Sequence, residues 1–164
     1  MHQPNIFTPH PVVAAESRRS GGVSPAPYHS LNLGNNTEDA PEHIGQNRQR
    51  FFKALGWPDG AFCYSHQVHG KEVLVASAPG GHHGYDAIIT KEPDLLIGVT
   101  IADCTPVLVF DPKQRAAAAI HAGWQGTAAR IVTHTLNRMQ EAFGTNPADC
   151  LAYVGTCITQ PHYE

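Results

Sequence analysis

Residues 100–124 read TIADCTPVLVFDPKQRAAAAIHAGW, and this stretch decides both the fold class and the candidate site. Two runs within it, 106–110 and 116–121, are short, largely apolar and bounded by proline or aspartate, which favours strands. Cys104 stands just before the first run, and His121 closes the second. The stretch therefore predicts two strands whose ends carry side chains able to bind a metal ion.

Further short strands are predicted on both sides of this stretch. Residues 61–69 alternate between two faces, which is the period of a strand, and His69 ends that strand just before Gly70. The glycine-flanked pair His82-His83 is interpreted as a flexible, exposed loop. The other predicted strands are 11–15, 72–76, 85–90, 95–102 and 151–154.

Two helices are predicted between the strands. The first begins at Asp39, with Glu42 three residues later as a capping-box partner, and Gly56 followed by Pro58 ends it. The second covers 127–143, where apolar residues recur at helical spacing. Because strands outnumber helices and no repeat or linker is visible, we expect a mixed α/β (α+β) fold of layered sheets flanked by helices. We expect residues 1–164 to form a single domain.

Composition narrows the class of protein. The formal net charge of -3 argues against a nucleic-acid binder, which would present a basic face. No apolar stretch is long enough to span a bilayer, and the first residues do not resemble a signal peptide. The four cysteines form no CxxC pair, so free thiols or metal ligands are expected rather than disulfides. We therefore expect a cytoplasmic protein without membrane or nucleic-acid partners. A monomer or weak homodimer is expected, although composition does not determine the oligomeric state.

Three candidate metal ligands, His69, Cys104 and His121, each stand where a strand gives way to a loop. Two imidazoles and one thiolate suit Zn²⁺, and three protein ligands leave a fourth tetrahedral position open, as in catalytic sites. Their spacing alone is weak evidence for a metal site and favours the alternative of a buried thiol and two histidines bonded to backbone. A closed structural site is a further alternative, with Cys157 or His162 as the fourth ligand.

Seven segments together resemble the laccase-domain family, whose members have been called multicopper polyphenol oxidases and purine nucleoside phosphorylases. The resemblance covers nearly the whole chain, and its motifs are specific only in combination and in this order. The segments are Ser20-Gly21-Gly22-Val23-Ser24, Leu31-Asn32-Leu33-Gly34, Asn47-Arg48, Gln67-Val68-His69-Gly70, Asp86-Ala87-Ile88-Ile89-Thr90, Thr100-Ile101-Ala102-Asp103-Cys104-Thr105-Pro106 and His121-Ala122-Gly123-Trp124.

The resemblance implies an enzyme that splits adenosine, inosine, guanosine or methylthioadenosine with phosphate and that deaminates adenosine. It implies catalytic metal ligands at His69, Cys104 and His121, with zinc as the expected metal and copper as the alternative. It also matches the family's phosphate-contacting arginine to Arg48, whose guanidinium suits an oxyanion. The expected partners are thus purine nucleosides and phosphate. Without the resemblance, Arg48 would be interpreted as an exposed helix residue.

Three other residues are candidates for substrate binding, each with a structural alternative. Asn32 stands in a glycine-bearing loop and either contacts substrate or forms a turn. Asp103 adjoins Cys104 and either orients a ligand or caps a turn. Trp124 either stacks on a purine or packs into the protein.

The chain departs from the family pattern at two places. Gln125 stands where the family usually has arginine after the tryptophan, which removes a positive charge near the site. The segment Gly155-Thr156-Cys157-Ile158 replaces the usual Gly-Pro start, and family members typically continue beyond residue 164. We therefore expect part of the family fold to be absent at the C-terminal end.

Two other enzyme classes compete with the nucleoside phosphorylase. A copper polyphenol oxidase needs a blue copper site and a copper cluster, hence many more histidine ligands than these motifs supply. A metal-free hydrolase would use Cys104 as nucleophile and His69 or His121 as base. The same residues serve both the hydrolase and the metal site, so the sequence leaves this alternative open.

Overall fold

The computed structural model describes residues 1–57 and 61–163, so Pro58 at the expected helix end and Glu164 lie outside the described residues. No helix in the described part is both long and apolar enough to cross a membrane. The elements in chain order are η1 (Asn5–Phe7), α1 (Pro41–Leu55), β1 (Phe62–His66), β2 (Val73–Val75), β3 (Gly80–His83), β4 (Ala87–Thr90), β5 (Leu96–Ile97), β6 (Thr105–Asp111), β7 (Ala116–Ala122), α2 (Trp124–Ala128), α3 (Ile131–Phe143), η2 (Pro147–Asp149), β8 (Leu151–Val154) and η3 (Gln160–His162).

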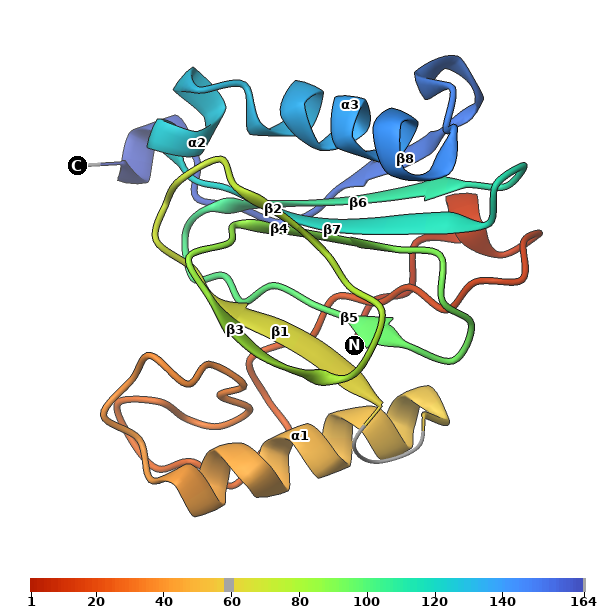
Figure 1. The fold of residues 1–164 in the computed structure, drawn as a ribbon. Coiled ribbons are helices and arrows are strands. Elements are labelled where there is room, and N and C mark those ends of the chain that lie inside the picture. The colour runs from red at the N-terminus through yellow and green to blue at the C-terminus, as the bar shows by residue number, and fades with distance from the viewer. Residues whose placement is uncertain (58–60, 164) are drawn as a thin grey trace.

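The strands form two sheets. The larger has the order β2-β4-β7-β6-β8 and is antiparallel except for the β2–β4 pair. The smaller has the order β3-β1-β5, and both of its pairs are parallel. In Figure 1, α3 lies along the outer side of the large sheet and α1 along the outer side of the small one. The expected mixed α/β fold with layered sheets and flanking helices is confirmed.

Apolar side chains hold each helix to its sheet. Ile131 and Met139 of α3 are fully buried in the main core, together with Ile89 and Ile120 of the large sheet. Full burial of one such side chain contributes about 1.5–3 kcal/mol. On the other side, Phe52 of α1 packs on the small sheet through its ring contact with β1. A second buried cluster, Cys63, Ala76 and Ile88, joins the two sheets.

Several predicted strands are shorter than expected or absent. β1 ends at His66 rather than residue 69, since the three N–H groups of residues 68–70 donate to a buried carboxylate. β5 is reduced to Leu96–Ile97, although 95–102 was expected. Residues 11–15 form no strand, and the only nearby ladder contact is an isolated bridge between His2 and Glu16. The strand predicted at 151–154 is confirmed as β8.

Two further expectations for the chain between the strands are wrong. The predicted helix 127–143 is split into α2 and α3, because Arg130 adopts a left-handed backbone (φ 59°) between them. The pair His82-His83 is not a loop, because it lies in β3, where it pairs with Ser65 and His66 of β1. The sequence offered no strand signal there, since glycines flank the histidines.

The start of α1 differs from the predicted capping box. The helix begins at Pro41 with Ala40 as N-cap, and it has no side-chain cap. Asp39 instead accepts hydrogen bonds from Ser24, Asn32 and His43, which ties the preceding loops to the helix. Burial alone would raise the pKa of Asp39, but these hydrogen bonds outweigh it and lower the pKa to about 2.

Asp39→Asn should reduce the free energy of unfolding at neutral pH, because the charged hydrogen-bonded carboxylate stabilises the folded state. The folded-state pKa is lowered, so this contribution is complete above about pH 4 and is lost as the pH falls to about 2. Denaturant unfolding of both proteins across this range measures the difference, which should shrink as the pH falls. Glu42→Gln, an exposed change in the same helix, is the control; equal stability of Asp39→Asn and wild type at pH 7 would contradict the prediction.

Candidate metal centre

The two sheets bring the three predicted ligands together. His69 lies in the turn after β1, where its backbone is left-handed (φ 60°). Cys104 directly precedes β6, and His121 lies in β7 opposite Pro106 of β6. Antiparallel pairing of β6 with β7 therefore places Cys104 and His121 at the same end of the large sheet, and the turn carries His69 to that end.

One ligand atom from each of His69, Cys104 and His121, an imidazole nitrogen or the thiol sulfur, lies within 4.8 Å of the other two. The two imidazole rings meet edge to face, with centroids 4.9 Å apart. In a tetrahedral zinc site, bonds of about 2.0–2.3 Å place ligand atoms roughly 3.4–3.8 Å apart. The trio is therefore close to the size of a zinc site, and the residues present fit a metal ion with two nitrogen donors and one sulfur donor. Among the described residues, it is the only such group.

Gly123 forms one wall of this cluster. A Cβ at this position would lie 3.1 Å from His69 Cδ2, 3.2 Å from Cys104 Sγ and 3.7 Å from His121 Cε1. The first two contacts are tighter than side chains normally allow. Glycine at 123 therefore keeps open the space in which the three donor atoms converge.

Asp86 orders the cluster from inside the protein. The residue is completely buried, and its carboxylate accepts the backbone N–H groups of Val68 (3.1 Å), His69 (2.9 Å) and Gly70 (2.8 Å). The same carboxylate accepts a hydrogen bond from Nδ1 of His121 at 2.8 Å. Because a carboxylate only accepts, Nδ1 carries the proton and Nε2 keeps its lone pair for a metal.

The buried Asp86 side chain remains a charged carboxylate. Burial alone would raise the pKa of Asp86, but the hydrogen bonds from His121, Gly70 and Val68 outweigh it and lower the pKa. Sequence reasoning assigned this residue no role, although it belongs to one of the seven segments. The available signal was an aspartate directly before β4, a strand with no exposed residue. A charged residue beside a wholly buried strand needs a partner, which Asp86 finds in His121.

The Cys104 thiol is harder to ionise than usual without a cation. Burial raises the pKa of Cys104, and the carboxylates of Asp103 and Asp86 raise it further. A bound cation has the opposite effect on a thiol, since metal coordination favours the thiolate. The electrostatic surroundings therefore favour a metal ligand over a metal-free nucleophile at this position.

A reciprocal pair of amide hydrogen bonds joins the segments that carry His69 and Cys104. Gln67 Nε2 donates to the Thr100 carbonyl at 2.8 Å, and the Thr100 N–H donates to Gln67 Oε1 at 2.8 Å. The Gln67 side-chain amide thus pairs with the backbone C=O and N–H groups of Thr100, as the backbone of a neighbouring strand would. It ties the chain before Cys104 to the turn that carries His69.

Arg48 is half-buried in α1 and is not the exposed helix residue of the alternative interpretation. Its Nε and Nη2 donate to the Leu33 carbonyl at 3.1 and 2.9 Å. Its guanidinium lies over Tyr64, 4.7 Å from the ring centroid, and over Phe62 at 5.6 Å. Burial lowers the pKa of Arg48, while Tyr64 acts in the opposite direction. No carboxylate in residues 1–57 and 61–163 forms an ion pair with it.

The other three candidates have different surroundings. The Asn32 side chain donates to Thr37 and Asp39 and accepts from the Gly34 N–H, so it organises its own loop. Asp103 is exposed beside Cys104. Trp124 is 66% exposed at the start of α2, so the alternative of a buried, packing tryptophan is wrong.

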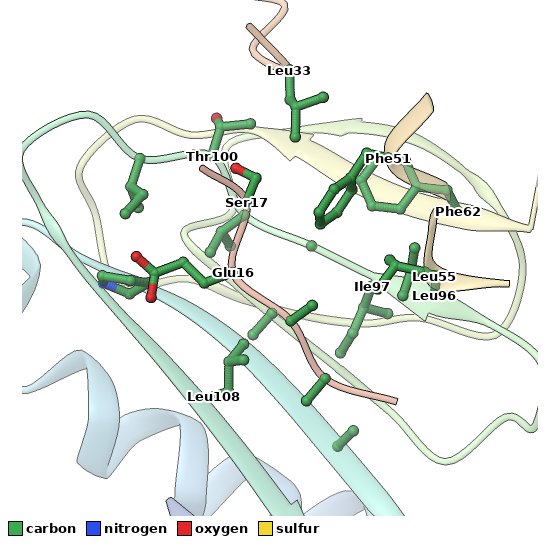
Figure 2. A pocket seen from close by; sticks show the side chains of 18 of the residues that line it. Glu16, Ser17, Leu33, Phe51, Leu55, Phe62, Leu96, Ile97, Thr100 and Leu108 are labelled. Carbon is green, nitrogen blue, oxygen red and sulfur yellow. The ribbon is translucent and has the colours of Figure 1, made fainter. Parts of the chain in front are cut away.

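One cavity between the two sheets connects most of these residues. Its volume is about 1940 Å³, and its lining includes His69, Cys104, His121 and Arg48. Asn32 and Asp103 also line it, whereas Trp124 does not. Figure 2 shows its apolar part, where Phe62 of β1 and Leu96 and Ile97 of β5 lie across from Leu108 of β6. The cavity exceeds the roughly 300–1,000 Å³ of ordinary ligand sites, so a small substrate fills only part of it.

Similar proteins were found by sequence. A purine nucleoside phosphorylase from Deinococcus radiodurans is 40% identical over 164 residues, which is all of this chain and 62% of that protein. Purine nucleoside phosphorylase YfiH from Escherichia coli is 38% identical over 157 residues, 95% of this chain and 63% of the relative. The chain thus spans less than two thirds of the length of these relatives.

Solved structures share the fold. The crystal structure of the Bacillus licheniformis hypothetical protein YfiH superposes with a TM-score of 0.85 at 28% identity, covering 88% of this chain and 58% of that chain. YlmD from Geobacillus stearothermophilus gives the same TM-score and identity, covering 88% of this chain and 57% of that chain.

A family model described as multi-copper polyphenol oxidoreductase laccase matches residues 13–164. This match includes the three candidate ligands, Asp86 and Arg48. Relatives that are at least 35% identical to this chain include proteins named purine nucleoside phosphorylase from several bacteria. The chain therefore belongs to this laccase-like family, the one that also contains the YfiH purine nucleoside phosphorylases.

Proposed function

We propose that this protein is a zinc-dependent purine nucleoside phosphorylase. The observation that carries the proposal is the convergence of His69, Cys104 and His121 at one wall of a cavity that Arg48 also lines. The names of the relatives support the same reaction, although the chain spans only 62% of the first of them. The reaction would cleave the bond between purine and ribose with phosphate, releasing the free base and ribose 1-phosphate.

Asp86 and Gly123 keep the three candidate ligands in an arrangement suited to a metal ion. Asp86 holds the His121 ring in the orientation that leaves Nε2 free, and it fixes the His69 turn through three backbone N–H groups. Gly123 keeps the centre open. With zinc bound, the site supplies a Lewis acid beside the cavity that would receive the nucleoside.

Arg48 is proposed to hold phosphate. Its half-buried guanidinium has no carboxylate partner in the described chain, so an anion would supply the missing counter-charge. The Leu33 carbonyl and the aromatic rings of β1 fix its orientation before any ligand arrives. A preorganised guanidinium of this kind binds an oxyanion with little loss of side-chain freedom.

The finer assignments rest on the family resemblance. Adenosine, inosine, guanosine and methylthioadenosine are the proposed nucleosides, and adenosine deamination is a proposed second activity. Trp124 is proposed to stack on the purine, which its exposure favours. Asp103 would act on Cys104 through its charge, and Asn32 through the shape of its loop. A cytoplasmic location and a monomer or weak homodimer are also proposed.

Two rival functions have less support. Copper polyphenol oxidation follows the family's description, but blue and multicopper sites need more histidine ligands than the single trio that the described residues provide. A cysteine hydrolase needs an easily ionised thiol, whereas burial and two carboxylates raise the pKa of Cys104.

Cys104→Ala should abolish both metal binding and phosphorolysis, because it removes the only sulfur donor of the trio. Wild-type protein purified without added metal should contain near-stoichiometric zinc by elemental analysis, and it should release adenine from adenosine only when phosphate is present. Cys150→Ala, which lies outside the cluster, is the matched control and should retain both properties. Unchanged turnover by Cys104→Ala would exclude the proposed role of this thiol.

Asp86→Asn should weaken zinc binding by about 10–100-fold, the usual loss on changing a partner that orients a metal-bound histidine. The nearly isosteric amide preserves volume but removes the charge that fixes the His121 proton on Nδ1. Competition with a chromophoric chelator measures the zinc affinity without any activity assay. Asp94→Asn, an exposed change elsewhere, is the control. An affinity equal to that of wild type would show that Asp86 only supports the fold.

A further inference from the structure

Cys157 stands next to the candidate metal centre without being part of it. The donor atoms that converge there come from His69, Cys104 and His121, and Cys157 does not belong to this group. Cys104 and Cys157 are both free thiols of intermediate exposure. Cys104 also lines the large cavity between the sheets, so a small solute can reach its side chain.

The pairing of the last strand places the two cysteines opposite each other. β6 and β8 lie side by side as antiparallel strands in the large sheet (Figure 1). Two backbone hydrogen bonds, both 2.9 Å long, carry the same register past the end of β8 toward the metal centre. They run from the N–H groups of Gly155 and Ile158 to the carbonyls of Pro106 and Asp103. In this register, Cys157 is the residue opposite Cys104.

The two positions are close enough for a disulfide. Directly opposed residues of an antiparallel pair have Cα atoms about 4.5–5.5 Å apart, and disulfides join residues whose Cα atoms are roughly 4.4–6.8 Å apart. The neighbouring pair shows how closely the chains approach, because a Cβ on Gly155 would lie 2.7 Å from Pro106 Cγ.

The side chains of the two cysteines also share a face of the sheet. Cys104 and Pro106 both line the large cavity. Residues two apart along an extended chain lie on the same side, so Cys157 lies on the side of Gly155, which faces Pro106. The two sulfur atoms can therefore meet by rotation of their side chains.

We propose that Cys104 and Cys157 form a reversible disulfide when the protein meets hydrogen peroxide, and that this bond withdraws Cys104 from the metal centre. The sulfur of one cysteine, as thiolate, attacks a peroxide oxygen, and the O–O bond breaks to leave a sulfenic acid. The departing hydroxide takes up the proton that the thiol had lost and becomes water. The second sulfur then attacks the sulfenic sulfur, the S–O bond breaks and a second water leaves. The two thiols are oxidised, and the peroxide is reduced to water.

The disulfide would leave only His69 and His121 as donors of the trio. A sulfur bonded to Cys157 is no longer a thiolate, which is the form that binds metal ions. This loss of metal rests on the proposed metal site, whereas the disulfide itself does not. Reduction by a thiol reagent would restore both cysteines. Cys157 would thus protect Cys104 from oxidation to sulfinic acid, which thiol reagents do not reverse.

Peptide mapping after peroxide treatment tests the disulfide directly. Trypsin, which cleaves after lysine and arginine, places Cys104 in peptide 92–113 and Cys157 in peptide 139–164. The second peptide also contains Cys150, so Cys150→Ala protein is mapped beside the wild type. Both proteins should yield these two peptides cross-linked, and reduction should separate them. A cross-link that requires Cys150, or none at all, would overturn the proposal.

Zinc release, followed with a chromophoric chelator, tests the effect on the metal centre. Peroxide should release zinc from wild type and Cys150→Ala, and a thiol reductant followed by fresh zinc should restore binding in both. Cys157→Ala should bind zinc normally before oxidation and fail to recover it afterwards, since its Cys104 has no partner thiol. Equal recovery in Cys157→Ala and wild type would overturn the protective role of Cys157. Loss of zinc from unoxidised Cys157→Ala, with an unchanged melting temperature, would also overturn it, because Cys157 would then be a metal ligand.

Further outcomes separate this inference from the proposed function. A disulfide between Cys104 and Cys157 in a protein that binds no zinc would support the modification and contradict the metalloenzyme. A zinc-containing protein that releases adenine with phosphate but never forms the disulfide would overturn the inference and leave the proposed function intact.

Discussion

The buried carboxylate of Asp86 is the interaction on which the site depends. It accepts three consecutive backbone N–H groups from residues 68–70 and the Nδ1 proton of His121. These backbone groups follow the end of β1 directly, so the carboxylate holds the turn that carries His69. An unpaired charge at full burial would cost several kcal/mol. Four hydrogen bonds offset that cost and at the same time fix two of the three candidate ligands.

This arrangement joins two sheets that share few backbone contacts of their own. The small parallel sheet supplies Gln67 and His69 through the turn after β1, and the large sheet supplies Cys104 and His121 at the end of its β6–β7 pair. Gln67 bonds to Thr100 across the gap, and the Asp86 carboxylate bonds to the β1 turn from the start of β4. These polar bonds connect the sheets at the metal-site end of the cavity, while the apolar cluster of Cys63, Ala76 and Ile88 also joins them.

The sequence predicted the elements that strong local patterns specify and missed those that depend on distant partners. The strands at 106–110, 116–121 and 151–154 were predicted within one residue or so, because their apolar runs end at proline, aspartate or glycine. β3 was not predicted, because the sequence Gly80-Gly81-His82-His83 has low strand propensity. This segment is a strand because it pairs with β1. The positions of the trio at strand ends made it a candidate, and the family resemblance assigned it as a metal site. Asp86 was missed: its place beside a wholly buried strand indicated that it needs a partner, but its partners lie 16 to 35 residues away and the local sequence does not name them.

The absence of a side chain at Gly123 matters for judging which relatives can bind a metal ion. Even one methyl group there would press on His69 and Cys104, at 3.1 and 3.2 Å. Relieving such contacts requires His69 and Cys104 to move by a few tenths of an ångström, whereas metal–ligand distances in protein sites stay within about 0.2 Å of their usual values. Alanine at this position would therefore disturb metal capture while leaving every donor atom in the sequence. A relative that retains both histidines and the cysteine but has lost this glycine is therefore expected to bind the metal ion more weakly, although its three ligands are unchanged.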